Sequence, residues 1–331
     1  MTNTIKERIK WVDCAKGIAI LLVILGHTYN VDSLGRELIY SFHIPMFFIL
    51  SGYTFNPANN FNYFIQKTKK DFLRLILPVL IIFFITSLYK VIINFDSIKL
   101  SEFLNNSFNT LIYSSGVRLN TDNGRVAALG MCWFLVSLFG TKTIYNFLWL
   151  ILKKRAFILS IFLLTLLGLY CSYKTINLYF NLDVTLMILP FFLVGNYFNK
   201  IEVKQNILLS PLVNLGIWIS ILLICNSTAF YYFELAARRY PLFPLCYIGA
   251  ISASIFMFSL SKKITSIKFL DNIFTNIGKN TFYIFCVHCI DFIYQPLWNI
   301  SEYDTLNGII RILLDLIITF FLLKIINKKA N

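Results

Sequence analysis

The chain has 331 residues, of which 57% are hydrophobic and only 14% are charged, and its formal net charge is +14. Soluble domains are roughly 45–50% apolar and about 25% charged. A soluble fold of this length has no means of burying so much apolar surface, whereas a lipid bilayer accommodates it. The basic residues occur in short clusters between apolar segments, a pattern typical of cytoplasmic loops and unlike the basic face of a nucleic-acid-binding domain.

The apolar segments predict an all-α integral membrane protein, a bundle of about ten transmembrane helices that forms a single domain over residues 1–331. The first segment contains Asp13, Lys16 and His27 and lacks a small-residue cleavage site, so we interpret it as a retained span and not as a secretory signal. The predicted spans are 11–30, 37–55, 73–94, 129–151, 156–173, 183–198, 207–225, 241–260, 276–296 and 305–326.

The basic clusters predict the orientation of these spans. If the N-terminus is cytosolic, clusters such as Lys69–Lys70, Lys153–Arg155 and Lys262–Lys263 all fall in inner segments, where basic residues are enriched. An even number of spans then places both termini in the cytosol. The longest outer segment, 94–128, is polar, and we expect a loop that is either functional or disordered.

The seven cysteines lie within or beside apolar segments, so we expect small core residues and no disulfide framework. Cys286, His288 and Cys289 resemble a metal cluster. Such a site needs a fourth ligand from elsewhere, and the sequence shows no second pair of this kind. We therefore expect no metal site.

The three histidines, His27, His43 and His288, all fall inside predicted spans. At 1.5 Å per residue, His27 lies roughly 24 Å from the inner end of its span, His43 roughly 9 Å from the outer end, and His288 roughly 18 Å from the inner end. All three are therefore predicted in the outer half of the membrane. Ionisable residues at this depth usually face the bundle interior or a water-filled cavity, which indicates one buried polar site.

Lys16 and His27 are eleven residues apart, almost three helical turns, so both project from nearly the same face. Asp13 lies one turn before Lys16 and can pair with it. One interpretation is an interfacial ion pair and a histidine satisfied by a neighbouring helix. The other is an acyl-transfer site, in which imidazole takes a proton from a hydroxyl and returns one to a thiolate, or carries the acyl group itself. A nearby cation would then hold donor phosphates or steady the oxyanion.

Four stretches of the chain resemble the motifs of membrane acyltransferase family 3, and within it the fucose 4-O-acetylase-like O-acetyltransferases. They run from Arg8 to Thr28, from Tyr40 to Tyr53, from Trp133 to Leu135 and from Ile277 to His288, in the family's order over nearly the whole chain. The resemblance implies a ten-helix enzyme of bacterial inner membranes that transfers acetyl groups from acetyl-CoA to surface or lipid-linked polysaccharides. It implies no permanently bound cofactor, and its expected partners are acetyl-CoA, the glycan or lipid-linked oligosaccharide acceptor and membrane lipid, with no nucleic acid.

The resemblance assigns the main catalytic roles to Lys16 and His27. Many family members carry arginine at the first of these positions, and lysine offers a point charge without the bidentate fork. Our hypothesis is that His27 is the general base and that Lys16 assists the donor. The supporting pocket is predicted to contain Asp13, His43, Trp133 and His288, and candidates for donor or acceptor binding are Ser51, Gly52, Asn280, Arg118 and Arg125.

Several of these residues also have plainer interpretations. Trp133 is an interfacial anchor or a stacking face for a sugar, Gly52 permits helix packing or donor approach, and the two loop arginines are either solvated or lipid-binding. Two further functions fit intramembrane lysine and histidine: a proton-coupled transporter or flippase for lipid-linked sugars, and a non-catalytic sensor of the same fold. The chain shows no related halves of the kind that many transporters have.

Overall fold

The computed structural model describes residues 8–93, 99–121, 124–199, 210–228 and 233–330. Contacts group the chain into two compact units. The first unit comprises Met1–Leu50, Glu202–Phe233 and Tyr240–Asn331, and the second comprises Ser51–Ile201 and Glu234–Arg239. Whether they behave as a single domain stays a prediction.

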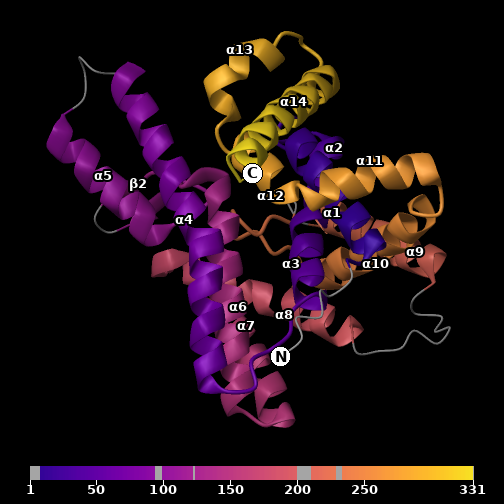
Figure 1. Cartoon of the computed structure of the whole chain (residues 1–331). Coiled ribbons are helices and arrows are strands. Elements are labelled where there is room, and N and C mark those ends of the chain that lie inside the picture. Colours follow the sequence, from indigo (N-terminus) through magenta and orange to yellow (C-terminus); the bar gives the residue numbers. More distant parts are fainter. Residues whose placement is uncertain (1–7, 94–98, 122–123, 200–209, 229–232, 331) are drawn as a thin grey trace. The chain divides into compact units, whose positions relative to one another are not determined.

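The first unit contains the segments that carry the three histidines (Figure 1). Its elements are α1 (Lys10–Gly26), α2 (Leu34–Tyr40), most of α3 (His43–Tyr53), α9 (Pro211–Thr228), α10 (Leu245–Ile264), α11 (Lys268–Lys279), α12 (Thr281–His288), the 3-10 helix η5 (Asp291–Tyr294), α13 (Gln295–Trp298) and α14 (Asp304–Ala330).

The second unit is built on four long helices and contains a small antiparallel hairpin, in which Leu119 pairs with Val126. Its elements are α4 (Phe61–Ile93), α5 (Leu100–Tyr113), β1 (Leu119–Thr121), β2 (Gly124–Val126), η2 (Gly130–Cys132), α6 (Trp133–Ile151), α7 (Lys154–Tyr173), η3 (Tyr179–Asn181) and α8 (Leu182–Phe198).

The described helices confirm a multi-pass, predominantly helical membrane protein. Only 11% of the most apolar stretch of α4 is buried, and Phe84 and Ile92 on this helix are 68% and 67% exposed. Such surface suits lipid and not water. Among the described residues, five segments are long and apolar enough to cross a membrane: Phe61–Ile93, Gly130–Ile151, Lys154–Tyr173, Tyr179–Phe198 and Leu245–Ile264. The count of ten spans and the orientation stay predictions.

Two predicted spans are not continuous helices. The segment 37–55 breaks between α2 and α3 because Pro45 has no N–H to donate to the Ser41 carbonyl and its ring would clash there. The Ser41 hydroxyl donates instead to Leu38 O at 2.7 Å and accepts from Trp218 Nε1 at 2.9 Å. The segment 276–296 divides at Asn280 into α11 and α12 and continues as η5.

The expected outer loop, 94–128, is also partly regular. It contains α5 and the β1–β2 hairpin, whereas 94–98 and 122–123 lie outside the described residues. Helix α5 ends at Ser114, whose φ of 50° places it in the left-handed region, where a helix stops. This long segment therefore forms a helix and a hairpin where a loop was expected.

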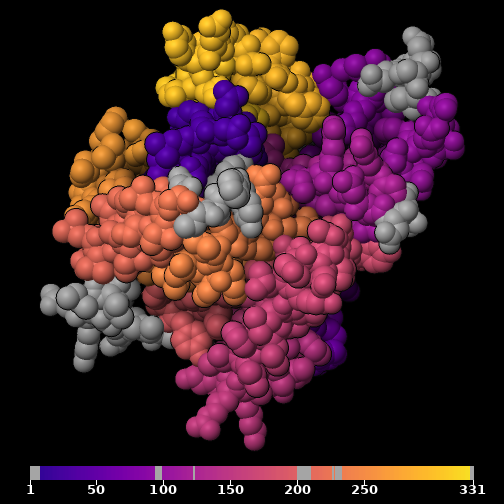
Figure 2. Space-filling model, turned by 180° about the vertical axis from the view of Figure 1, so that it is seen from behind, coloured from indigo at the N-terminus to yellow at the C-terminus, as the bar shows by residue number. Residues whose placement is uncertain are grey.

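Helices α1 and α11 approach closely through two glycines. A Cβ on Gly278 would collide with the carbonyl oxygen of Asp13, and one on Gly17 would collide with that of Phe274. In Figure 2 the indigo N-terminal residues lie beside the yellow surface of α14, which also contacts α1. The two glycines thus allow α1, the helix that precedes His27, to pack closely against α11 within the first unit.

A Gly278→Ala substitution is expected to lower the free energy of unfolding by about 1–3 kcal/mol, because backbone must move to admit the methyl group. Gly216 in α9 is the matched control, since a Cβ there meets no atom of the described residues within 4 Å. Alanine at that position should be neutral or stabilising by up to about 1 kcal/mol. Thermal unfolding of the two purified variants in detergent measures the difference. Equal unfolding midpoints would show that the α1–α11 contact accommodates the methyl group without loss of stability.

Candidate functional site

The first helix ends at Gly26, and His27 is its C-cap. The backbone N–H of His27 donates to Val23 O at 3.0 Å, which places its ring at the C-terminus of α1. A Cβ on Gly26 would lie 3.0 and 3.1 Å from side-chain atoms of Ile39 and Tyr40, so only glycine lets α2 close this tightly against α1. The Tyr40 hydroxyl consequently lies 3.0 Å from His27 Nδ1.

The three imidazoles follow one another in a row of ring contacts. The Tyr40 ring centroid is 4.8 Å from that of His43 and 5.8 Å from that of His27. The His27 centroid is 5.6 Å from that of His288. His43 and His288 are buried and His27 is half-buried. The structure therefore brings together the three histidines of the sequence analysis, while their catalytic roles stay predictions.

Backbone contacts fix His43 at the start of α3. Its Nδ1 lies 2.7 Å from the carbonyl oxygen of Ile39. Because a carbonyl only accepts, Nδ1 carries the hydrogen and donates it. The guanidinium carbon of Arg36 lies 4.3 Å from the Tyr40 ring centroid, so a cation covers the aromatic ring between the first two histidines.

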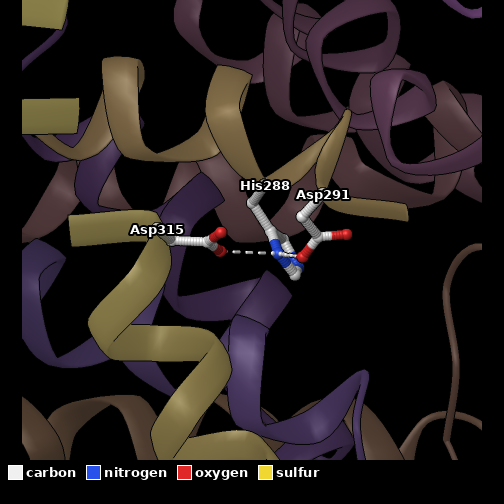
Figure 3. A group of neighbouring side chains, drawn as sticks. All are labelled: His288, Asp291 and Asp315. Carbon is white, nitrogen blue, oxygen red and sulfur yellow. Dashed lines mark hydrogen bonds and ion pairs between the residues drawn. The ribbon is translucent and has the colours of Figure 1, made fainter. Parts of the chain in front are cut away.

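Two carboxylates contact His288 at the end of α12 (Figure 3). Its Nδ1 lies 2.7 Å from Asp291 Oδ2 and 3.1 Å from Asp315 Oδ2. The Tyr294 hydroxyl donates to Asp315 Oδ1 at 2.6 Å. His288, Asp291 and Asp315 are each at most 1% exposed, so water does not compete for the hydrogen bonds between them.

Arg311 of α14 neutralises one of these carboxylates. Its Nε and Nη2 donate to the two oxygens of Asp291 at 2.5 and 2.8 Å, a bidentate pair. Its Nη1 donates to Thr28 Oγ1 at 3.3 Å, and its guanidinium carbon lies 4.3 Å from the Trp298 ring centroid. A Cβ on Gly308 would come within 2.6 Å of the Leu25 side chain, so this glycine lets α14 approach the end of α1.

The geometry of His288, Asp291 and Asp315 also meets the minimum for a metal site, since one ligand atom of each lies within 4.8 Å of the others. These atoms are already engaged, however. Both oxygens of Asp291 accept from Arg311, and Asp315 accepts from Tyr294 and His288. A metal ion would have to displace these donors, so the arrangement fits a hydrogen-bonded ion-pair network better than a metal centre.

Lys16 and Asp13 lie toward the other end of α1. Lys16 Nζ is 3.8 Å from Asp13 Oδ1, and Arg8 Nε is 2.9 Å from Asp13 Oδ2. The Lys16 side chain is 29% exposed. Along the helix, Lys16 and His27 are separated by roughly 16 Å. The predicted ion pair is thus confirmed, and Asp13 contacts Lys16 and Arg8 instead of the histidines.

The other predicted site residues lie away from the histidine row or in the second unit. A Cβ on Gly52 in α3 would collide with Phe192 O in α8, so this glycine serves helix packing. A Cβ on Gly116, in the segment between α5 and β1, would collide with the buried Trp133 ring, so this glycine lets the segment pack against the start of α6. Ser51 is half-buried, Arg118 and Arg125 are exposed, and Asn280 donates through its side chain to Asn276 O at 2.9 Å.

Sequence reasoning missed Tyr40 in the histidine row and, in the ion-pair network, the charged residues Asp291, Arg311 and Asp315. The last three are charged residues inside predicted spans, which is itself a signal of function because such residues are costly in a bilayer. His288 and Asp291 are also one helical turn apart in sequence. Tyr40 carried no comparable signal, because a tyrosine near a span end is ordinarily an interfacial anchor.

Comparison with known protein families matches residues 9–326 to the model of an acyltransferase domain. The match spans both compact units and includes every residue of the histidine row and the ion-pair network. No curated protein and no solved structure matches the chain.

Proposed function

Because the chain belongs to the acyltransferase 3 family, we propose that it transfers an acetyl group from acetyl-CoA to a hydroxyl of a cell-surface or lipid-linked polysaccharide. The observation that supports this most strongly is the pair of imidazoles, His27 and His288, whose ring centroids are 5.6 Å apart beside a buried ion-pair network. Acyl transfer to a hydroxyl needs a group that takes up and releases a proton near neutrality, and imidazole does both.

His27 is the residue of the pair that faces a partly open environment, since it is half-buried whereas His288 is fully buried. A donor thioester therefore reaches His27 first. The imidazole either exchanges a proton with the reacting groups or receives the acyl group at a ring nitrogen before passing it to the hydroxyl. Both routes need the ring of His27, and neither tolerates its removal.

Lys16 is proposed to bind the donor's phosphates, roughly 16 Å from His27 along α1, while the extended thioester arm reaches toward the histidines. Replacing Lys16 by methionine is expected to weaken acetyl-CoA binding by about tenfold, the equivalent of 1.4 kcal/mol. Lys10→Met is the control, because Lys10 lies on the same helix and pairs with Asp271 at 3.7 Å but is 74% exposed. Calorimetric titration of the purified proteins compares them, and unchanged binding in the Lys16 variant would remove this residue from the donor site.

The acceptor proposal is tested by the mass of the surface polysaccharide from strains with and without the gene. We expect an acetyl-sized difference that alkaline hydrolysis of esters abolishes. Identical glycans in both strains would contradict the proposal. Acetyl-CoA binding by the purified protein separates it from a flippase for lipid-linked sugars, which has no use for a thioester donor.

We further propose that the protein resides in the cytoplasmic membrane of a bacterium with both termini in the cytosol. The donor is made in the cytosol, and the basic clusters favour this orientation. Lys16, near the start of α1, would then lie on the side from which acetyl-CoA arrives.

A further inference from the structure

The contacts of His288 show which of its ring nitrogens carries the hydrogen in the neutral ring. The two groups within hydrogen-bond distance of Nδ1 are the carboxylates of Asp291 and Asp315. Ionised carboxylates only accept, so Nδ1 carries the hydrogen and donates it. In the neutral ring the other nitrogen, Nε2, therefore holds a free lone pair.

This Nε2 atom is buried, and among the described residues it has no hydrogen-bond partner. A buried polar atom without a partner costs roughly 1–3 kcal/mol, so its retention needs a reason. The other nitrogen of the same ring has two acceptors, and the His27 ring lies 5.6 Å away. Nε2 is thus a basic nitrogen without a described partner, on a ring that adjoins the ring of His27.

Two carboxylates adjoin this ring and can balance the charge of an imidazolium that forms during the reaction. Asp291 and Asp315 bring two negative charges, and Arg311 brings one positive charge to Asp291. When His288 is neutral, one negative charge in this buried group remains uncompensated. A proton that arrives at Nε2 produces an imidazolium next to a carboxylate that is already in place to stabilise it, as in the histidine–aspartate pairs of hydrolases.

His27 lacks this support. The residue that contacts its Nδ1 is Tyr40, a neutral hydroxyl at 3.0 Å, and the described structure places no carboxylate in hydrogen-bond contact with the His27 ring. A hydroxyl can orient an imidazole, but it does not balance the charge of an imidazolium. The two rings therefore differ in the charge state that their surroundings stabilise.

On the basis of the proposed acetyl transfer, we infer that His288 is a second catalytic residue and the base that activates the acceptor hydroxyl. Its Nε2 takes the hydroxyl proton as the oxygen bonds to the thioester carbonyl carbon. The C–S bond then breaks, and the coenzyme A thiolate takes the proton back from the imidazolium. Asp291 and Asp315 are positioning residues, and His27 acts on the donor side. This inference moves the base from His27, where the sequence placed it, to His288.

The test uses His288→Asn, whose side-chain amide can donate to the carboxylates as Nδ1 does but offers no basic nitrogen. Transfer to the sugar hydroxyl should fall about 10²–10⁴-fold in kcat, with KM for acetyl-CoA and the unfolding temperature close to those of the wild type. Hydroxylamine, a nucleophile that needs no deprotonation, should still accept the acetyl group at nearly the wild-type rate. A residue with only a structural role would affect both acceptors equally.

Asp315→Asn is the second variant, because its amide can donate to Nδ1 and so favour the wrong tautomer. It should show the same selective loss for the hydroxyl acceptor. Asp183→Asn in the second unit is its matched control, since Asp183 is buried and paired with Arg238 at 2.6 Å. This control should retain kcat for both acceptors when rates are corrected for folded protein.

Wild-type protein that acetylates neither acceptor would refute the proposed function itself. With an active wild type, equal loss of both acceptors in His288→Asn, or full retention of sugar acetylation, would overturn the assignment of the base. A divalent metal ion that is bound one per chain and lost in Asp315→Asn would also overturn it, in favour of a metal centre.

Discussion

Replacing His27 by alanine is expected to remove acetyl esters from the surface polysaccharide, with a loss of turnover of about 10²–10⁴-fold. The donor-side role proposed for His27 depends on this ring, which lies at the end of α1 next to Tyr40 and His288. The alanine variant keeps the Gly26 approach of α2 to α1, so the packing around the site should survive. Mass analysis of the polysaccharide from complemented strains measures the effect.

Two controls make this result interpretable. Membrane insertion and the thermal unfolding midpoint of the His27→Ala protein should match those of the wild type, because the half-buried ring has one hydrogen-bond partner among the described residues. Tyr40→Phe should cause a smaller loss, since it removes only the hydroxyl that orients the ring. Acetylation at the wild-type level in the His27→Ala strain would exclude His27 from the chemistry.

Replacing Arg311 by methionine is expected to lower the free energy of unfolding by about 3–5 kcal/mol. Methionine keeps much of the volume of the side chain, so the main change is an Asp291 carboxylate left in the interior without its bidentate partner. Thr28 and Trp298 also lose their contacts with the guanidinium. Thermal unfolding in detergent micelles measures this loss.

The double variant Asp291→Asn/Arg311→Met should recover part of that stability, because it leaves no unpaired buried charge. Arg239→Met is the exposed counterpart, since Arg239 lies 3.9 Å from Glu234 and is 42% exposed. That change should cost about 0–1 kcal/mol. If the effects of the Asp291 and Arg311 changes simply added, the two side chains would not be coupled in the way described.

The clustering of the three histidines could be predicted from the sequence. A helix rises 1.5 Å per residue, so the distances of His27, His43 and His288 from the predicted span ends gave all three a similar predicted height. Ionisable residues predicted at that depth usually face the interior of the helix bundle. The Asp13–Lys16 ion pair could also be predicted from the sequence, since residues one helical turn apart share a face.

The breaks in the second and ninth predicted spans could not be predicted in this way. Hydropathy is averaged over about 20 residues, so it does not show a local interruption of a helix. The second span breaks at Ser41 and Phe42, shortly before Pro45, but proline is tolerated in many membrane helices, so its presence did not predict a break. The break after His288 matters for the site, because the turn and η5 place Asp291 beside the imidazole.

The partners of His288 depend on contacts between distant parts of the chain, which no spacing rule supplies. Asp315 is 27 residues further along, and Arg311 reaches Thr28 in the turn after α1, near the other end of the chain. Gly308 is one reason that α14 and α1 come so close, and its role is visible only when the neighbouring Leu25 side chain is in place. The carboxylates beside His288 could therefore not be predicted from the sequence, whereas the assignment of the base to His27 stays a prediction.

Acyl transfer at the histidine row is tested most directly with the purified protein in lipid vesicles, supplied with acetyl-CoA and the de-esterified surface polysaccharide. Free thiol and glycan ester are measured together over time. We predict that the wild type releases one thiol for each ester formed and that His27→Ala protein, inserted and folded to the same extent, forms neither. Ester formation by that variant at the wild-type rate would contradict acyl transfer at these histidines.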